Sequence, residues 1–185
     1  MNLKSRDLVL ISMFAALTAV GAFIRIPLPI VPFTLQYFFC ALGAILLGAK
    51  RGAIAQILYV AIGLIGIPVF TQGGGPQYIF KPTFGYLLGF IVGAYIIGII
   101  SEKLKDVTVK NIFIACVCGL GAIYVLGLIY MYIVMNFYLG KAYSVWKVVA
   151  IGFLPFIGGD LVLTLLISLV GVRVIPILNK LGLMD

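Results

Sequence analysis

Residues Phe70–Tyr86, with the sequence FTQGGGPQYIFKPTFGY, form a polar, aromatic and glycine-dense segment between two long hydrophobic runs. Membrane proteins place irregular backbone only where it lines water, a ligand or a cavity inside the protein. The consecutive glycines Gly73, Gly74 and Gly75 allow positive φ or close approach of the backbone to a ligand, and a proline near each end of the loop restricts its edges. We therefore expect this segment to form a lid over a small-molecule site.

The composition of the chain places it in a membrane. Hydrophobic residues make up 64% and charged residues 10% of its 185 residues, whereas soluble domains carry about 25% charged residues. In a soluble protein the formal net charge of +8 would indicate nucleic acid. Here the basic residues lie between apolar runs, so we expect contact with a lipid bilayer and none with nucleic acid. The three cysteines lie inside apolar runs and histidine is absent, so no metal site is expected.

The apolar stretches predict the fold class. A membrane-spanning helix needs about 20 apolar residues, and the charged residues divide the chain into stretches of roughly this length. We expect an all-α integral membrane protein, a bundle of six transmembrane helices in a single substrate-binding domain over residues 1–185. The predicted helices cover about residues 7–26, 34–49, 52–68, 83–101, 111–139 and 154–177.

The basic residues also predict the orientation. If the N-terminus is cytoplasmic, most of the 13 basic residues lie on the cytoplasmic side, and those outside are Arg25, Lys81, Lys141 and Lys147. The positive-inside rule then places both termini in the cytoplasm and the glycine loop outside. No glycine-rich loop ending in Lys-Ser or Lys-Thr is present, so the sequence predicts no ATP-binding domain of its own.

Asp160 is the acidic residue that differs from the others, because it lies inside the last apolar stretch, at the end of the sequence FLPFIGGD. An ionisable residue within a membrane span indicates a functional site. A lone carboxylate in an apolar pocket is suited to accept two N–H bonds from a ligand, and such charge-assisted bonds are strong. The alternative is a structural role, as a partner for Arg25 or as a charge at a helix end.

Further candidates lie on the predicted outer side. Lys81 and Arg25 are suited to pair with an anionic group of a ligand, although both residues are also suited to reach lipid headgroups. The glycine loop is suited to present backbone N–H groups to an anion. Tyr78 and Tyr86, like the aromatic residues beside them, offer flat walls with a polar handle, or simply pack. Uncharged polar groups are present at Gln36 and Gln72.

A stripe of small residues marks the first predicted helix. Ala15 and Ala19 are four residues apart, a spacing that lets another helix approach closely. Packing within the bundle is the simpler interpretation, and docking of a partner helix is the alternative.

Four blocks of sequence resemble one known family. They are IPLPIVPFTLQ at 26–36, GLIGIPVF at 63–70, PTFGYLLGF at 82–90 and PFIGGDL at 155–161. Together with the glycine loop, these blocks resemble the BioY family, the biotin-specific S components of energy-coupling-factor (ECF) transporters, in the same order and over nearly the whole chain. The family often carries Lys three residues after its Asp, and here Leu163 fills that place, which makes Lys81 a stronger candidate for the carboxylate of a ligand.

The resemblance implies a six-helix membrane protein that binds biotin near the extracellular face of a prokaryotic cytoplasmic membrane. It implies association with a transmembrane coupling subunit and two ATPase subunits, and it suggests that Ala15 and Ala19 form an Ala-x-x-x-Ala docking motif. Combined with the residues themselves, it gives a set of expected substrate-binding residues: Asp160, Tyr86, Lys81, Gln36, Thr83, Gly73, Gly74, Gly75, Tyr78 and Gln72.

The expected function is high-affinity capture of biotin for an ECF-type ABC importer, without catalysis and without a cofactor. One alternative is an S component for another small vitamin. A self-sufficient secondary transporter or channel is disfavoured, because such proteins commonly show duplicated halves and several intramembrane charges. A membrane enzyme acting on lipid is disfavoured because the chain lacks histidine, a nucleophile elbow and paired carboxylates within one span.

Overall fold

Helices account for most of the structure, a computed structural model that describes residues 4–180. Residues 1–3 and 181–185 of the predicted domain lie outside the described residues. The elements in chain order are α1 (Ser5–Phe23), β1 (Arg25–Ile26), β2 (Phe33–Thr34), α2 (Gln36–Leu64), the 3-10 helix η1 (Pro76–Phe80), α3 (Phe84–Glu102), α4 (Val109–Ile133), the π-helical turn η2 (Val134–Tyr138), α5 (Val145–Gly152) and α6 (Leu154–Lys180).

The length and apolar character of the helices confirm the all-α membrane class. Within residues 4–180, five stretches are long and apolar enough to cross a membrane: α1, α2, α3, α4 together with η2, and most of α6. The two short strands pair in antiparallel fashion, with Arg25 opposite Thr34, and form a small hairpin between α1 and α2. The short helix α5 was not expected from the sequence; Ser144 caps its N-terminus, and the Ser144 side chain accepts a hydrogen bond from the Lys147 N–H.

The long helix α2 is a hairpin of two arms, because the chain reverses at Gly48. Gly48 has φ 80° and ψ 178°, a conformation essentially confined to glycine. Across this reversal the Gln36 side chain reaches the Tyr59 hydroxyl at 2.8 Å, although 23 residues would separate the two by about 35 Å in a straight helix. The arms, residues 36–47 and 49–64, correspond to the predicted helices 34–49 and 52–68.

A side chain of α3 completes this reversal. The Ala49 N–H, an orphan donor at the start of the second arm, donates to Glu102 Oε1 at 2.8 Å. The acceptor that the reversal requires is therefore a side chain at the C-terminal end of the neighbouring helix α3.

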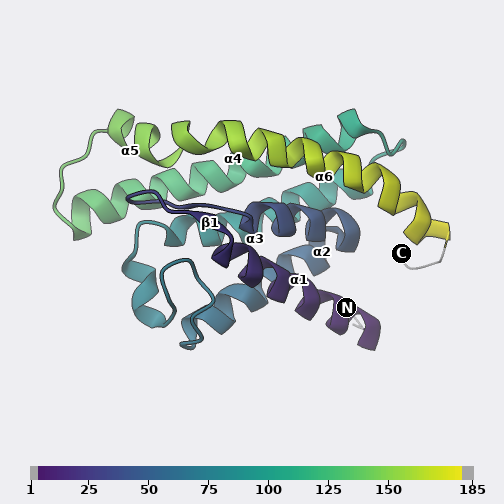
Figure 1. Ribbon diagram of the computed structural model, residues 1–185, viewed down its shortest axis with the longest axis horizontal. Helices are drawn as coiled ribbons and strands as arrows, with labels where there is room; N and C mark the ends of the chain where they lie inside the picture. The colour runs from purple at the N-terminus through teal and green to yellow at the C-terminus, as the bar shows by residue number, and fades with distance from the viewer. Residues whose placement is uncertain (1–3, 181–185) are drawn as a thin grey trace.

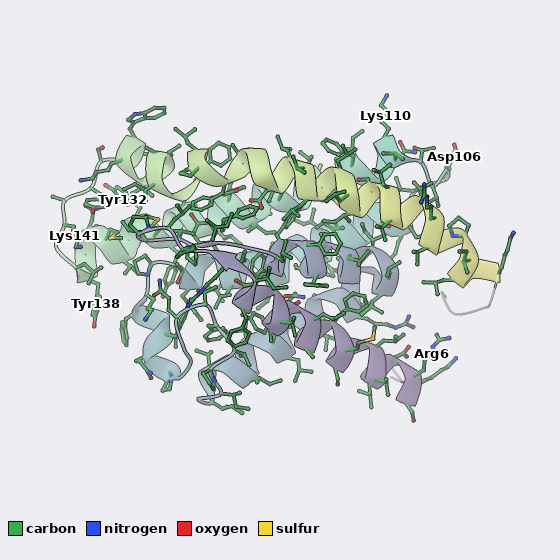
Figure 2. All side chains as sticks on the ribbon, in the orientation of Figure 1. Arg6, Asp106, Lys110, Tyr132, Tyr138 and Lys141 are labelled. Carbon is green, nitrogen blue, oxygen red and sulfur yellow. The ribbon has the colours of Figure 1, made fainter. Side chains whose placement is uncertain are left out.

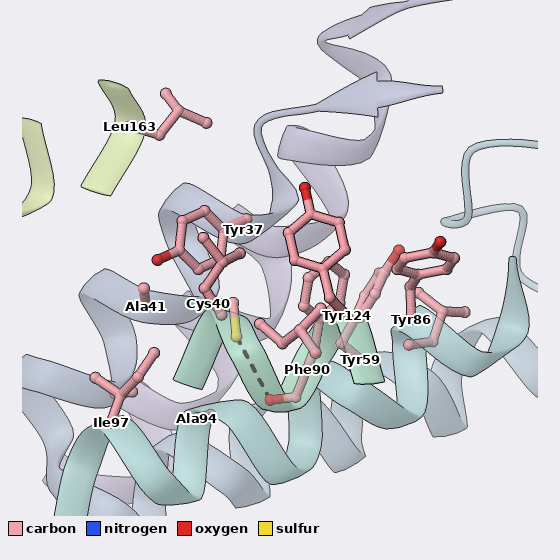
Figure 3. Packing of buried hydrophobic residues seen from close by; sticks show 14 of the residues in the cluster. Tyr37, Cys40, Ala41, Tyr59, Tyr86, Phe90, Ala94, Ile97, Tyr124 and Leu163 are labelled. Atoms are coloured by element: carbon pink, nitrogen blue, oxygen red, sulfur yellow. Dashed lines mark hydrogen bonds between the residues drawn. The ribbon is translucent and has the colours of Figure 1, made fainter. Parts of the chain in front are cut away.

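The core lies where α2, α3 and α4 pack together. Figure 3 shows Cys40 beside α3, where its thiol donates to the Phe90 carbonyl at 3.5 Å. Ala41 and Ala94 are fully buried in the same cluster, and small side chains at such positions let helices approach closely.

The two ends of the bundle differ. Figure 1 shows both termini at the same end, and the β1 hairpin extending toward the other. Arg6, Asp106 and Lys110 lie toward the end with the termini, whereas Lys141 and Tyr138 lie at the opposite end (Figure 2). With α2 counted as two arms, residues 4–180 contain an even number of long helical segments, which is why the chain returns to the end at which it starts. The cytoplasmic location of the termini remains a prediction.

Candidate functional site

A cavity lies between the β1–β2 hairpin, the loop after α2 and helices α2, α3, α4 and α6. Its free space of about 610 Å³ includes a part that is open to solvent. Five of the predicted site residues line it: Gln36, Tyr78, Thr83, Tyr86 and Asp160. Residues more than 120 positions apart in the sequence therefore meet at one place.

Asp160 supplies the acidic group of this cavity. It is 8% exposed, and its Oδ2 accepts a hydrogen bond from the Tyr124 hydroxyl. Among residues 4–180 no lysine or arginine forms an ion pair with it, so the structure does not support Arg25 as its partner. The backbone carbonyl of Asp160 accepts from Thr164 Oγ1 at 2.7 Å. The Oδ1 atom has no protein partner in the described part of the chain, and it remains available to a ligand.

Aromatic side chains form the walls. Tyr86 and Tyr124 meet edge to face, with ring centroids 6.3 Å apart, and Tyr124 meets Phe153 in the same way at 4.8 Å. The Tyr86 hydroxyl donates to the Gly152 carbonyl at 2.8 Å. Figure 3 shows Tyr37, Tyr59, Tyr86 and Tyr124 gathered in the core. Such walls favour a flat apolar ligand and leave few polar atoms to define its orientation.

Gln36 is held in place by a short hydrogen-bond chain. Its Nε2 donates to the Tyr59 hydroxyl at 2.8 Å, and that hydroxyl donates to the Val69 carbonyl at 3.1 Å. Its Oε1 accepts from Thr34 Oγ1 at 3.1 Å. Because an amide nitrogen carries two N–H groups, one donor of Gln36 is left for a carbonyl in the cavity.

Three hydroxyl groups form a second polar region. The Tyr78 hydroxyl lies 3.1 Å from Thr71 Oγ1 and 3.2 Å from Thr83 Oγ1. All three residues line the cavity, and Tyr78 is 2% exposed. This cluster presents hydroxyl donors on the loop side of the cavity.

The remaining loop residues of the predicted site lie behind this cluster. Lys81 Nζ donates to Gln72 Oε1 at 3.1 Å and lies 5.4 Å from the centre of the Tyr78 ring. Neither Lys81 nor Gln72 lines the cavity. The Tyr78 ring therefore lies between Lys81 and the cavity.

The three glycines do not line the cavity either. The Gly73 N–H donates to the Phe70 carbonyl and the Gly75 N–H donates to the Gly63 carbonyl, at 3.2 and 2.7 Å. Gly74 packs so closely against the Ile67 carbonyl that no side chain would fit. These donors hold the loop to the end of α2, and in this structure they are not directed at a ligand as a backbone nest requires.

The β1–β2 hairpin contributes a wall that the sequence did not indicate. Residues 31–34 line the cavity, and the Phe33 ring lies against Gly159, where an added Cβ would come within 2.7 Å of two ring atoms. Glycine is needed at position 159 for this close approach. The hairpin thus closes on the residue that precedes Asp160.

Tyr124 and Tyr37 are the other residues that sequence reasoning missed. The Tyr37 hydroxyl lies 2.9 Å from Thr164 Oγ1, which bonds the Asp160 carbonyl. Both tyrosines occur inside apolar runs, where a phenolic oxygen needs a buried partner. That need was the available signal, although it did not identify the partner.

The small-residue stripe of α1 mostly faces inward. Ala15 is 2% exposed in the core, and Ala19 is partly buried against it. Ala16, one position along, is exposed. Ala15 therefore packs within the chain, as the simpler interpretation expects.

Comparison with known proteins identifies the family of this chain. The model of the BioY family matches residues 1–180. The chain belongs to the BioY family. Within this family it is 45% identical to a probable biotin transporter BioY of Lysinibacillus sphaericus, covering 94% of this chain and 89% of the relative. It is 43% identical to the biotin transporter BioY of Thermotoga maritima, covering 91% of this chain and 95% of that one.

A solved structure shares the fold of this BioY-family chain. It is the crystal structure of the S-component for biotin from an ECF-type ABC transporter, with a TM-score of 0.80 at 23% identity and coverage of 94% of both chains. The likeness extends over nearly the full length, so the resemblance inferred from the four sequence blocks is confirmed at the level of family and fold.

Proposed function

We propose that this chain is the biotin-binding S component of an ECF-type importer, a substrate-capture subunit that is not an enzyme. The observation that carries the proposal is the Asp160 carboxylate, which offers one unpartnered oxygen to an aromatic-walled cavity. Membership in the BioY family and the names of the relatives support biotin as the ligand.

The chemistry of biotin matches the polar groups of the cavity. Its ureido ring carries N–H donors, one of which the free oxygen of Asp160 would accept, and a carbonyl, for which the remaining N–H of Gln36 is the donor. Its apolar bicycle would lie against the Tyr86 and Tyr124 rings, which line the cavity. Hydrogen bonds to a charged acceptor are stronger than those between neutral groups, so Asp160 dominates recognition of the ring.

The carboxylate of biotin has two candidate partners at the loop side. The hydroxyl cluster of Thr71, Tyr78 and Thr83 lies in the cavity wall, and Lys81 lies behind the Tyr78 ring. We propose that the hydroxyls contact the carboxylate and that Lys81 acts on it across the partly exposed rim. Arg25 is exposed on β1 and does not line the cavity.

The proposal extends to partners and location. A transmembrane coupling subunit and two ATPase subunits would supply the energy, and the chain would span the cytoplasmic membrane with both termini inside. We propose that the exposed face of α1 meets the coupling subunit. Ser12 and Ala16 are exposed there, four residues apart, and small residues at this spacing permit close helix contact.

Ligand identification tests the proposal. The chain is purified alone in detergent, and mass spectrometry identifies any small molecule that co-purifies. Calorimetry then measures binding of biotin without partner subunits, and uptake is measured in cells with and without an ATPase module. Binding of biotin by the isolated chain, with uptake only when the module is present, is expected. Binding of a different vitamin, or uptake that is independent of any ATPase, would overturn the proposal.

A further inference from the structure

Tyr124 is placed to control the geometry of Asp160. It lies on α4 and faces α6, it is 6% exposed, and its hydroxyl donates to Asp160 Oδ2. It also lines the cavity itself. A buried phenol in this position donates its single proton to one oxygen of the carboxylate, which leaves the other oxygen directed elsewhere.

The carboxylate needs such a restraint. Rotation about the terminal torsion of an aspartate is broad and has little intrinsic preference. The main chain of Asp160 is held separately. The Thr164 hydroxyl donates to the Asp160 carbonyl at 2.7 Å, and the Tyr37 hydroxyl lies 2.9 Å from the Thr164 hydroxyl. These contacts do not touch the carboxylate. Among the described residues, Tyr124 is the protein donor that does.

Tyr124 is itself rigidly held. Its ring meets Phe153 edge to face at 4.8 Å and an interplanar angle of 82°, and it meets Tyr86 at 6.3 Å and 87°. Tyr86 is anchored in turn by its bond to the Gly152 carbonyl. A donor fixed from two sides transmits its own orientation to the group that it bonds.

We propose that Tyr124 is a positioning residue, which holds one oxygen of Asp160 so that the other accepts a ring N–H of the ligand. The inference rests on the proposed function and specifies how the site recognises the ligand. The chemical class selected is a small cyclic urea or amide with an N–H donor at its edge. Recognition of that edge depends on Tyr124, although Tyr124 forms no bond to the ligand in this role.

A double-mutant cycle with biotin tests this role on the full chain in detergent. Tyr124→Phe keeps the ring and removes the donor, and we expect biotin to bind about tenfold more weakly, the usual scale of one lost bond to a charged group. Asp160→Asn is expected to weaken binding further. In an Asp160→Ala background, Tyr124→Phe is expected to have little added effect, because the group that it positions is gone.

Tyr95→Phe on α3 is the matched control. Tyr95 is 43% exposed and lies outside the cavity wall, so biotin affinity is expected to stay within twofold. The inference would be overturned if the biotin affinity of Tyr124→Phe lay within twofold of that of the unmodified chain. It would also be overturned if Tyr124→Phe caused the same loss of affinity in both backgrounds. Absence of biotin binding by the unmodified chain would instead overturn the proposed function, which keeps the two failures distinct.

An infrared measurement covers the case in which Tyr124→Phe does not fold. The carboxylate bands of Asp160 are identified by difference from the Asp160→Asn variant in otherwise native protein. A carboxylate with one bonded oxygen is expected, and 3-fluorotyrosine at position 124, a stronger donor of nearly the same shape, is expected to shift its bands. Bands of a free carboxylate, or bands that fluorination leaves unchanged, would overturn the inference.

Discussion

At the scale of single residues, Asp160 is costly for the protein without its ligand. A buried acceptor without a partner loses about 1–3 kcal/mol of hydrogen-bonding free energy, and more when it is charged. One of its oxygens has the Tyr124 donor, but none of the described cations forms an ion pair with it. Stability alone does not account for a carboxylate in this position, whereas binding of an N–H ligand does.

Replacement of Asp160 tests this account directly. Asp160→Asn retains the shape but directs N–H groups at the N–H groups of the ligand, so we expect a loss of at least about 2 kcal/mol, or about thirtyfold, in biotin affinity by calorimetry. Asp106→Asn, at the opposite end of the molecule (Figure 2), is the control and is expected to bind normally. Affinity of Asp160→Asn within twofold of the unmodified chain would remove Asp160 from the site.

Lys81 is tested by changing the charge on the ligand as well as on the protein. Lys81→Ala is expected to weaken biotin by up to about fivefold, the limit for a partly exposed ion pair, and to weaken a neutral amide of biotin much less. A pair of charges contributes only when both are present, and this cycle isolates that contribution. Lys141→Ala, an exposed cation near the same end (Figure 2), is the control. Equal losses for both ligands would show that Lys81 supports the loop through Gln72 instead.

At the scale of elements, the cavity is closed by two segments of different construction. The loop from Thr71 to Thr83 is tied by its own hydrogen bonds and by the end of α2. The β1–β2 hairpin is short, and it reaches α6 through the contact between Phe33 and Gly159. The hairpin therefore depends on fewer bonds and is the element suited to open for a ligand.

Adjacent glycines of α6 provide a matched test of the hairpin. In Gly159→Ala the new methyl group would press on Phe33, whereas in Gly158→Ala it would meet nothing within 4 Å. Overpacking of this kind costs about 1–3 kcal/mol, so we expect biotin to dissociate about tenfold faster from Gly159→Ala in a radioligand exchange assay. Gly158→Ala, which gains the same helix propensity, is expected to behave as the unmodified chain. The same dissociation rate in both variants would argue against closure by Phe33.

The elements also show what the sequence predicted and why. Long apolar runs identified the membrane class, and the break at Lys50 and Arg51 marked the reversal of α2 within a few residues of Gly48. The helix α5 spans only Val145–Gly152, too short for a periodic pattern to distinguish it from a loop. The strands β1 and β2 have two residues each, and no sequence pattern specifies so short a pairing.

Within the site, the residues with unusual chemistry were predictable and their partners were not. Asp160 is exceptional as a charge in an apolar run, so composition alone indicated it. Tyr124 and Phe33 are ordinary aromatic residues in a membrane protein, and only the fold brings them to Asp160 and Gly159. Consecutive glycines favour a backbone nest for an anion, yet the fold uses the N–H groups of Gly73 and Gly75 within the protein.

At the scale of the whole molecule, we propose that binding and coupling occupy separate regions. Ala16→Trp is expected to leave biotin binding intact and to abolish both ATP-driven uptake and co-purification with a coupling subunit, because a large exposed side chain keeps a partner helix at a distance. Val125→Trp on α4, 56% exposed, is the control and is expected to support uptake. Normal uptake by Ala16→Trp would show that this face of α1 does not meet the coupling subunit. Ala15→Trp is expected to unfold the protein, since Ala15 is buried.

The reversal at Gly48 has a consequence for the surrounding lipid. At 1.5 Å per residue, the arms 36–47 and 49–64 are about 18 and 24 Å long, whereas the hydrocarbon layer of a bilayer is about 30 Å thick. A span shorter than this layer is accommodated by local thinning or by flanking side chains that reach the headgroups, at a cost of a fraction of a kcal/mol per Å. The two arms of α2 therefore create a hydrophobic mismatch on one side of the protein, and its energetic cost depends on the thickness of the membrane.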